Sequence, residues 1–447
     1  MAPRDPGVLR RAVLWLVCLA PFFFLSYGLA NGYASGLPSV GSVVFDWERL
    51  VPLWPWTIVP YWSIDLLYGL SFLLPRTRHE LDRHALRLLT AQLLAVSCFV
   101  LFPLRFSVER PALDGVFGHL FDLLMGFDKP FNQAPSLHIA LLVVLWVRYG
   151  CHARGPWRVL LHGWFALIGL SVLTTWQHHF FDLPTGALAG WLCVWLWPMT
   201  QRSPLALWRL TRDGQRLRLA LRYAVGALVC LALAIWGGGW ALWLCWPALA
   251  LLLVALNYLA LGAEGFQKGA DGRQSLAVQW LLAPYRLGAR LNAWLWTRRA
   301  PQAERIVDDL WLGPLAAAGA AGAPFTALLD ATAELQGPSA GRAYACLPLL
   351  DLVAPSVEQC RAGAALIERL LPQGPLLVAC ALGYSRSATL VAGWLLLSGR
   401  ARDVDAALAL LRRQRPRVVL GPAHRAVLEA LCAAPGAAPT DGALLHV

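Results

Sequence analysis

The chain has 447 residues, of which 58% are hydrophobic and only 14% are charged. A soluble protein carries about a quarter charged residues, so this composition argues against an ordinary soluble enzyme and indicates a membrane protein. The length is enough for two or three domains. The net charge is +12, and Lys129 and Lys268 are the only lysines. Because the arginines fall between apolar segments, they favour membrane orientation, and we expect no nucleic-acid partner.

The first half of the chain consists mostly of apolar segments. Eight are candidates for membrane-spanning helices: 11–30, 52–74, 85–104, 136–149, 157–175, 184–199, 219–236 and 239–262. A spanning helix needs about 20 mostly apolar residues, so the segments near 136–149 and 184–199 are short. The first segment is long and has no clean cleavage site after it, so we interpret it as an anchor and not as a signal peptide.

Arginines alternate between the connections of these segments. Arginines are dense before the first segment and in the connections 75–84, 150–156 and 200–222. They are sparse in the connections that alternate with these. Cytoplasmic loops collect Lys and Arg, so the N-terminus is predicted to be cytoplasmic, and eight spans return the chain to the cytoplasm before residue 263. Ten cysteines are present without a CxxC pair, so no disulfide or zinc framework is expected.

The arginine-poor side carries a group of polar residues at the ends of the spans. His178 and Asp182 are four residues apart and share a face if the segment is helical. Asp182 would then hold the His178 imidazole in one tautomer, and His178 would attack phosphorus. His138 would give a proton to the leaving oxygen, and Ser136 would cap a helix and help to bind phosphate.

This pattern resembles the type-2 phosphatidic acid phosphatase superfamily, closest to its inositol phosphorylceramide synthase branch. The resemblance rests on "RFSVERP" (105–111), "PSLH" (135–138) and "HHFFD" (178–182), and it implies a six-helix core over about residues 50–200. It also implies that Arg110 binds phosphate and that Arg105 replaces a missing lysine. Val172 stands where the superfamily has a second phosphate-binding arginine, and His179 competes with His178 for the nucleophile's role.

Residues 263–302 form a linker of different character. Within it, the stretch 275–299 mixes tryptophans with arginines, which is typical of a helix lying on a membrane surface. A plain linker helix is the alternative.

The last 145 residues alternate strand-like and helix-like segments. Strands are predicted at 305–313, 343–351 and 375–380, and helices at 356–371 and 385–399. This alternation favours an α/β domain with a mostly parallel sheet.

"VACALGYSRSATL" (378–390) places a cysteine and an arginine around the turn between a strand and a helix. The helix N-terminus and Arg386 would favour a Cys380 thiolate, and Arg386 can hold two phosphate oxygens. Gly383 permits the sharp loop, in which Ser385 also lies, and both are expected to bind phosphate. Ser387 can donate a hydrogen bond to the sulfur, and Asp351 can protonate the leaving oxygen.

"CALGYSRS", the upstream Asp351, "LLDATAEL" (328–335) and "RPRVVLGPAH" (415–424) resemble the dual-specificity branch of the cysteine-based phosphatases. This resemblance implies Cys380 as nucleophile, Arg386 as phosphate clamp, Asp351 as general acid and Ser387 as helper of the thiolate. The residue before the nucleophile is Ala379, where that family usually has His, which leaves a phosphate-binding domain without turnover as an alternative. The loop has no further basic residue, which suits a simple phosphomonoester.

Together these segments predict a multi-pass all-α membrane bundle followed by a C-terminal α/β cysteine-phosphatase domain. The expected divisions are a membrane domain (1–262), an amphipathic interfacial linker (263–302), a phosphatase-like domain (303–435) and a tail (436–447). The chain resembles bacterial fusions of the two families, which implies an inner-membrane protein with its N-terminus and C-terminal domain in the cytoplasm.

The leading functional hypothesis is a bifunctional phosphatase that acts on phosphorylated lipids or their head groups. It would form phosphohistidine on the outer face and phosphocysteine in the cytoplasm, with no metal or other cofactor. The expected partners are a phospholipid or lipid-phosphate substrate, membrane lipids and, as a second candidate, a phosphoprotein. A lipid head-group phosphotransferase with a regulatory or phosphoprotein-binding C-terminal domain is the alternative.

Overall fold

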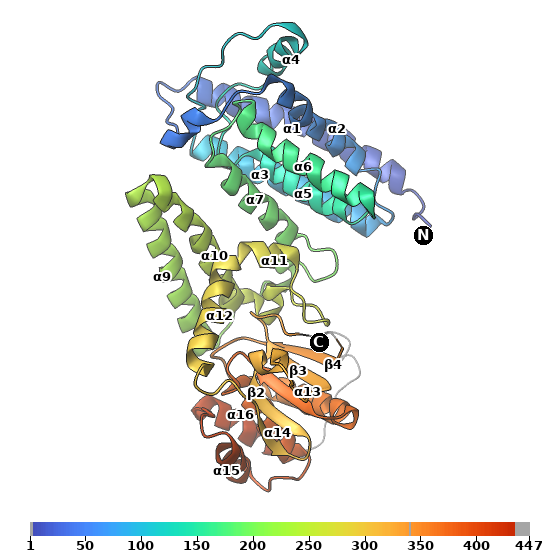
Figure 1. Ribbon diagram of the computed structural model, residues 1–447, viewed down its shortest axis with the longest axis vertical. Helices are drawn as coiled ribbons and strands as arrows, with labels where there is room; N and C mark the ends of the chain where they lie inside the picture. Colours follow the sequence, from blue (N-terminus) through green and yellow to red (C-terminus); the bar gives the residue numbers. More distant parts are fainter. Residues whose placement is uncertain (1–2, 339–340, 434–447) are drawn as a thin grey trace. The chain divides into compact units, whose positions relative to one another are not determined.

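The computed structural model describes residues 3–338 and 341–433. The chain divides into two compact units, one comprising residues up to 203 with 234–242, and the other comprising 204–233 with the residues from 243 onwards (Figure 1). The tail predicted at 436–447 lies outside the described residues. The domain boundaries drawn from the sequence stay predictions.

The first unit is helical. Its helices are α1 (Val8–Ser35), α2 (Ile58–Ser71), α3 (Arg78–Leu101), α4 (Gly115–Met125), α5 (Leu137–Gly150), α6 (Pro156–Thr174) and α7 (Asp182–Leu196), with short 3-10 turns at Asp46–Leu50 and Pro55–Thr57. Side-chain caps set two of the starts: the Thr77 hydroxyl accepts from the Glu80 N–H before α3, and the Ser136 hydroxyl accepts from the Ile139 N–H before α5.

Within the described residues, five helical stretches are long and apolar enough to cross a membrane. They are α1, α3, α6, α9 (Gly214–Gly237) and the stretch Gly239–Leu261, which contains α10 (Cys245–Leu256). The predicted spans 52–74, 136–149 and 184–199 correspond to helices of 14, 14 and 15 residues, which are shorter than the roughly 20 residues that a bilayer requires. A helical membrane region is therefore supported, while the count of eight spans and the six-helix core stay predictions.

Helices α5 and α7 pack unusually closely. A Cβ atom added at Gly186 would lie 2.5 Å from the Ser136 carbonyl oxygen, and one at Gly190 would lie 2.7 Å from the Ala140 carbonyl oxygen. These two glycines are four residues apart, so they form one small-residue face that lets the helix backbones approach. The close approach brings the start of α5 against the start of α7.

The second unit begins with α8 (Pro204–Leu207) and the hairpin of α9 and α10, and continues through α11 (Leu276–Leu281) and α12 (Ala283–Thr297). Its sheet comprises β1 (Glu304–Val307), β2 (Leu310–Pro314), β3 (Ala327–Thr332), β4 (Ala343–Leu349) and β5 (Leu376–Cys380). The remaining helices are α13 (Val357–Leu370), α14 (Arg386–Leu397), α15 (Val404–Gln414) and α16 (Pro422–Ala433).

The sheet is mixed, with strand order β1-β2-β5-β3-β4. Only the β1–β2 pair is antiparallel, and the other three pairings are parallel. The prediction of a single strand at 305–313 was wrong, because the chain turns at Asp308, whose φ is +47°, and pairs back on itself. The strand β3 was not assigned from the sequence at all.

Parallel pairing aligns the carboxyl ends of the neighbouring strands β5, β3 and β4. Cys380 ends β5, Glu334 follows β3 by two residues, and Asp351 follows β4 by two residues. Ligand sites of open α/β sheets lie at this edge. The fold therefore places a thiol and two carboxylates beside the N-terminus of α14.

Candidate active sites

The loop between β5 and α14 has a conformation that requires glycine. Gly383 has a φ of +72°, and a Cβ atom there would lie 2.3 Å from the carbonyl carbon of Gly313 on β2. Both the backbone conformation and the lack of space exclude a side chain. The predicted role of Gly383 in shaping this turn therefore has a steric basis.

Three successive carbonyl groups of this loop are held away from its centre. The Arg415 guanidinium donates to the carbonyl oxygens of Leu382 (3.2 Å) and Gly383 (2.9 Å), and the Val419 N–H donates to that of Tyr384 (2.9 Å). Arg415 is only 1% exposed. With these carbonyl oxygens bonded elsewhere, the loop N–H groups can serve an anion, as in anion-binding nests, and that of Gly383 donates to the Cys380 sulfur.

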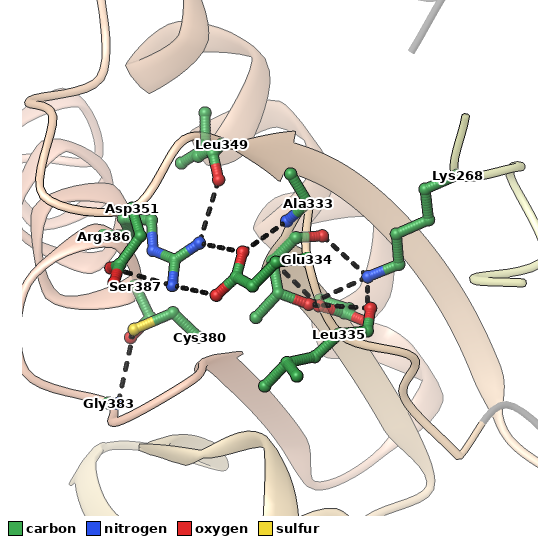
Figure 2. Close-up of polar contacts among 12 residues, drawn as sticks. Lys268, Ala333, Glu334, Leu335, Leu349, Asp351, Cys380, Gly383, Arg386 and Ser387 are labelled. Atoms are coloured by element: carbon green, nitrogen blue, oxygen red, sulfur yellow. Dashed lines mark hydrogen bonds and ion pairs between the residues drawn. The ribbon is translucent and has the colours of Figure 1, made fainter. Parts of the chain in front are cut away.

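The Cys380 sulfur lies at the centre of this loop and receives two hydrogen bonds. The Gly383 N–H donates to it at 3.3 Å and the Ser387 hydroxyl at 3.2 Å (Figure 2). The side chain is almost fully buried at the N-terminus of α14. Hydrogen bonds to the charged form and the positive end of the helix dipole both favour a thiolate.

Arg386 is clamped by the carboxylate of Glu334. Its two terminal nitrogens donate to the two Glu334 oxygens at 2.9 and 2.7 Å, and one of them also donates to the Leu349 carbonyl oxygen (Figure 2). Asp351 contacts the same guanidinium at 3.0 Å. The buried Nε of Arg386 has no hydrogen-bond partner among the described residues.

The two carboxyl groups around Arg386 are shifted in opposite directions. Burial acts to raise the pKa of Glu334, but the Arg386 guanidinium outweighs it and holds that pKa below its usual value. Removal of water raises the pKa of Asp351, and the Glu334 charge raises it further against the effect of Arg386. Two interacting carboxyl groups whose pKa values are shifted in opposite directions are typical of catalytic pairs in which one group stays ionised and the other carries a proton.

The sequence predicted Cys380, Arg386, Ser387 and Asp351 as site residues, and the structure brings these four together. The sequence analysis missed Glu334, although this residue lies in the quoted segment 328–335. The Ser385 hydroxyl lies 2.8 Å from His424 Nε2. Ala379 is fully buried in a small apolar cluster.

A cavity of about 340 Å³ adjoins this loop within the second unit. Its polar part includes Glu334 and Asp351, and its wall continues along helices α9, α10 and α12. The remaining lining residues are Tyr223, Pro247, Leu251, Pro284, Tyr285, Gly288, Ala289, Asn292, Ala381 and Leu382. The loop is thus bordered by the apolar hairpin and the amphipathic helix as well as by its own domain.

In the first unit, His178 forms the expected pair with Asp182. The distance from His178 Nδ1 to the Asp182 carboxylate is 3.1 Å, and the other ring nitrogen lies 3.2 Å from the Ser136 hydroxyl. The His179 N–H also donates to Asp182, at 3.0 Å. All three side chains are buried, so the pair fixes the orientation of the imidazole.

The neighbouring His179 is engaged elsewhere. Its Nδ1 lies 2.8 Å from the Glu48 carboxylate and its Nε2 lies 3.1 Å from the Ser107 hydroxyl. Burial acts to raise the pKa of Glu48, but the hydrogen bond to His179 and two backbone N–H groups lower it overall. His178 lines the same cavity as His138, whereas His179 does not, so His179 is the poorer candidate for a nucleophile.

His138 and His178 line one cavity of about 230 Å³. The His138 ring stacks on Tyr61 with 4.1 Å between centroids, and its buried Nε2 has no hydrogen-bond partner among the described residues. Asp65 and Asp128, which the sequence analysis did not single out, also line this cavity. Burial raises the pKa of the Asp128 carboxyl, which favours its neutral form there.

The two arginines predicted to bind phosphate lie outside that cavity. Arg105 and Arg110 line a separate, larger pocket of about 590 Å³. Arg110 donates to the carbonyl oxygens of Thr175 (3.1 Å) and Trp176 (3.0 Å), which holds the segment before His178 in place. The structure therefore gathers His138, His178, Asp182 and Ser136 but assigns the arginines no contact with them.

The sequence matches no protein-family model and no curated protein. Among solved structures, a mouse putative dual specificity phosphatase is 24% identical, with 29% of this chain and 86% of that chain covered at a TM-score of 0.27. Human DUSP28 is 24% identical over 29% and 93% of the two chains, also at 0.27. Tk-PTP is 27% identical over 30% and 98%, at 0.27. Each similarity covers less than a third of this chain.

Proposed function

We propose that the chain is a bifunctional membrane phosphatase that hydrolyses phosphomonoesters of lipids or lipid head groups. The observation that carries the proposal is the arrangement at Cys380. The site combines a thiol that receives two hydrogen bonds, an Arg386 Nε without a partner among the described residues and, in contact with Arg386, the Asp351 carboxyl, whose pKa is raised. This combination suits covalent phosphoryl transfer, because it provides a nucleophile, an anion clamp and an acid at one point.

In the proposed reaction, the Cys380 thiolate attacks phosphorus and the bond from phosphorus to the leaving oxygen breaks. Asp351 gives its proton to that oxygen. A water molecule then attacks the phosphocysteine while Asp351 takes up the water's proton, and the sulfur–phosphorus bond breaks to release phosphate. The Ser387 hydroxyl, 3.2 Å from the sulfur, stabilises the thiolate as it leaves.

The cavity beside the loop supports a lipid substrate over a freely soluble one. Pro247 and Leu251 of α10 and Gly288 of α12 border it, while Glu334 and Asp351 form its polar end. A phosphate carried on an apolar body would place its charge at Cys380 and its hydrocarbon part against these helices.

The second activity is proposed for the His178 site. The imidazole is held by Asp182 at 3.1 Å, and His138 lines the same cavity, which supports attack by His178 Nε2 and protonation of the leaving oxygen by His138. Arginine placement along the sequence supports an outer-face location for this site and a cytoplasmic location for Cys380.

The first test measures phosphate release by the detergent-purified full-length protein. The substrates are phosphatidic acid, a phosphatidylglycerol phosphate-type lipid and an aryl phosphate, and the variants are Cys380→Ser and His178→Ala. We expect each substitution to remove a different part of the activity by at least about 100-fold, as loss of a covalent nucleophile does.

Matched controls are Cys432→Ser and His119→Ala, which alter an exposed cysteine and an exposed histidine outside both sites. Unchanged activity of Cys380→Ser on every substrate would contradict the proposal for the C-terminal domain and favour phosphate binding without turnover. Unchanged activity of His178→Ala would remove the second site from the proposal.

A further inference from the structure

The residue that follows Asp351 does not anchor the loop by burial of its side chain. Leu352, the next residue, has a φ of +59°, a backbone conformation that non-glycine residues rarely adopt. Its side chain is 59% exposed, so burial of this leucine does not compensate for the strain. The position of the acid therefore depends on contacts from outside the loop.

Two such contacts come from the apolar hairpin. The Tyr258 hydroxyl, at the end of the helical stretch containing α10, donates to the Asp351 carbonyl oxygen at 3.0 Å. The Gln215 side chain, at the start of α9, donates to the Leu352 carbonyl oxygen at 3.3 Å. The two hydrogen bonds end on successive carbonyl groups of the loop that carries Asp351, so residues at both ends of the hairpin hold this loop.

Tyr258 is itself rigidly placed. It is 1% exposed, its ring stacks on Tyr223 with 5.4 Å between centroids, and its carbonyl oxygen accepts a hydrogen bond from Arg216 at 3.0 Å. A buried aromatic ring with a fixed backbone has few rotamers, so its hydroxyl is a well-defined donor.

The segment that carries the second carboxylate beside Arg386, that of Glu334, is also held by a residue close to the hairpin. Lys268, in the turn after the hairpin, donates to the Asp330 carboxylate at 2.7 Å and to the Thr332 carbonyl oxygen at 2.7 Å (Figure 2). Both charged side chains are completely buried. This anchors the end of β3, two residues before Glu334.

We propose that the two ends of the hairpin that carry Gln215 and Tyr258 are part of the Cys380 active site and that Tyr258 is the positioning residue for the general acid Asp351. The inference builds on the proposed cysteine phosphatase activity and adds a dependence of acid catalysis on the hairpin. Tyr258 acts through the Asp351 backbone and does not touch the substrate phosphate.

The test compares two kinds of leaving group in the full-length Tyr258→Phe variant, which loses only the hydroxyl. An alkyl phosphate needs a proton on its leaving oxygen, whereas p-nitrophenyl phosphate has a good leaving group and needs the acid far less. General acid catalysis contributes about 10²- to 10⁴-fold, so a misplaced acid should lower kcat for the alkyl phosphate about tenfold, with kcat for the aryl phosphate changed less than about twofold.

Asp351→Asn serves as the reference and should show the same selectivity with a larger loss. Tyr149→Phe serves as the matched control, because it removes a comparable bond, from a tyrosine hydroxyl to the Leu67 carbonyl oxygen at 2.7 Å, in the other unit. An equal loss on both substrates in Tyr258→Phe, or no loss on either, would overturn the inference. Failure of the underlying function is distinguished by Cys380→Ser, which would then leave phosphate release unchanged.

Discussion

At the scale of single residues, the site at Cys380 depends on which hydrogen-bond donors of Arg386 are bonded to other protein groups. Glu334 occupies the two terminal nitrogens of Arg386 and leaves Nε free. A bidentate pair fixes the plane of the guanidinium, so Nε keeps its direction before any phosphate arrives. The same charges separate the pKa values of the two carboxyl groups: Glu334 stays ionised, and Asp351 keeps its proton to higher pH.

This difference in pKa predicts that the rate of hydrolysis declines at high pH. The acid must be protonated, so kcat for an alkyl phosphate should fall as pH rises through the raised pKa of Asp351. In Asp351→Asn that high-pH decline should disappear, and the remaining rate should be lower by about 100-fold. Steady-state rates between pH 5 and 9 check this. An unchanged decline in the variant would assign it to another group.

At the scale of elements, the histidine site depends on the contact between α5 and α7. Gly186 leaves no room for a Cβ atom against the Ser136 carbonyl, and the same turn of α5 carries His138. Catalytic groups on two helices keep their spacing only while the helices stay in this contact, and a displacement of about 1 Å can cost about 100-fold in rate.

Gly186→Ala should therefore separate the two helices and lower the His178-dependent phosphate release at least tenfold. Release that depends on Cys380 should stay unchanged. Gly28→Ala on α1 is the control, because an added Cβ atom meets no atom within 4 Å there. Equal activity of the two variants would argue against a tight α5–α7 contact as the basis of the site.

The elements that were predictable from the sequence are the ones whose signal is local. The Cys380 loop lies between an apolar strand and a helix that directly follows, and His178 and Asp182 are four residues apart in the sequence, although α7 begins only at Asp182 and the segment before it is not helical. The partner of Arg386 is 52 residues away in Glu334, so no local pattern links them. The turn at Asp308 was missed because a hairpin inside a continuous strand-like stretch depends on one residue with positive φ.

At the scale of the whole molecule, the second unit joins an apolar hairpin to the α/β domain through polar contacts. The Lys268 ammonium is fully buried against Asp330, and Tyr344 donates to the same carboxylate at 2.9 Å. Breaking a buried ion pair by removing one partner leaves an uncompensated charge. The turn that carries Lys268 is therefore coupled to the stability of the α/β domain.

Lys268→Met should lower the free energy of unfolding of the C-terminal domain by about 3–5 kcal/mol. Arg305→Met, which removes an exposed pair with Asp309, should cost less than about 1 kcal/mol. Denaturant unfolding of the full-length protein, followed by tryptophan fluorescence, measures both. Equal effects of the two variants would show that the buried pair does not couple the segments.

The contacts of Arg415 have a consequence for the order of biosynthesis. The carbonyl groups of the Cys380 loop are held by residues that the ribosome makes about 30 to 40 positions later, namely Arg415 and Val419, and Ser385 pairs with His424. The nucleophile therefore emerges before the groups that shape its loop. The apolar helices are therefore synthesised and available for membrane insertion before the Cys380 loop can take its final shape, which requires residues 415–424.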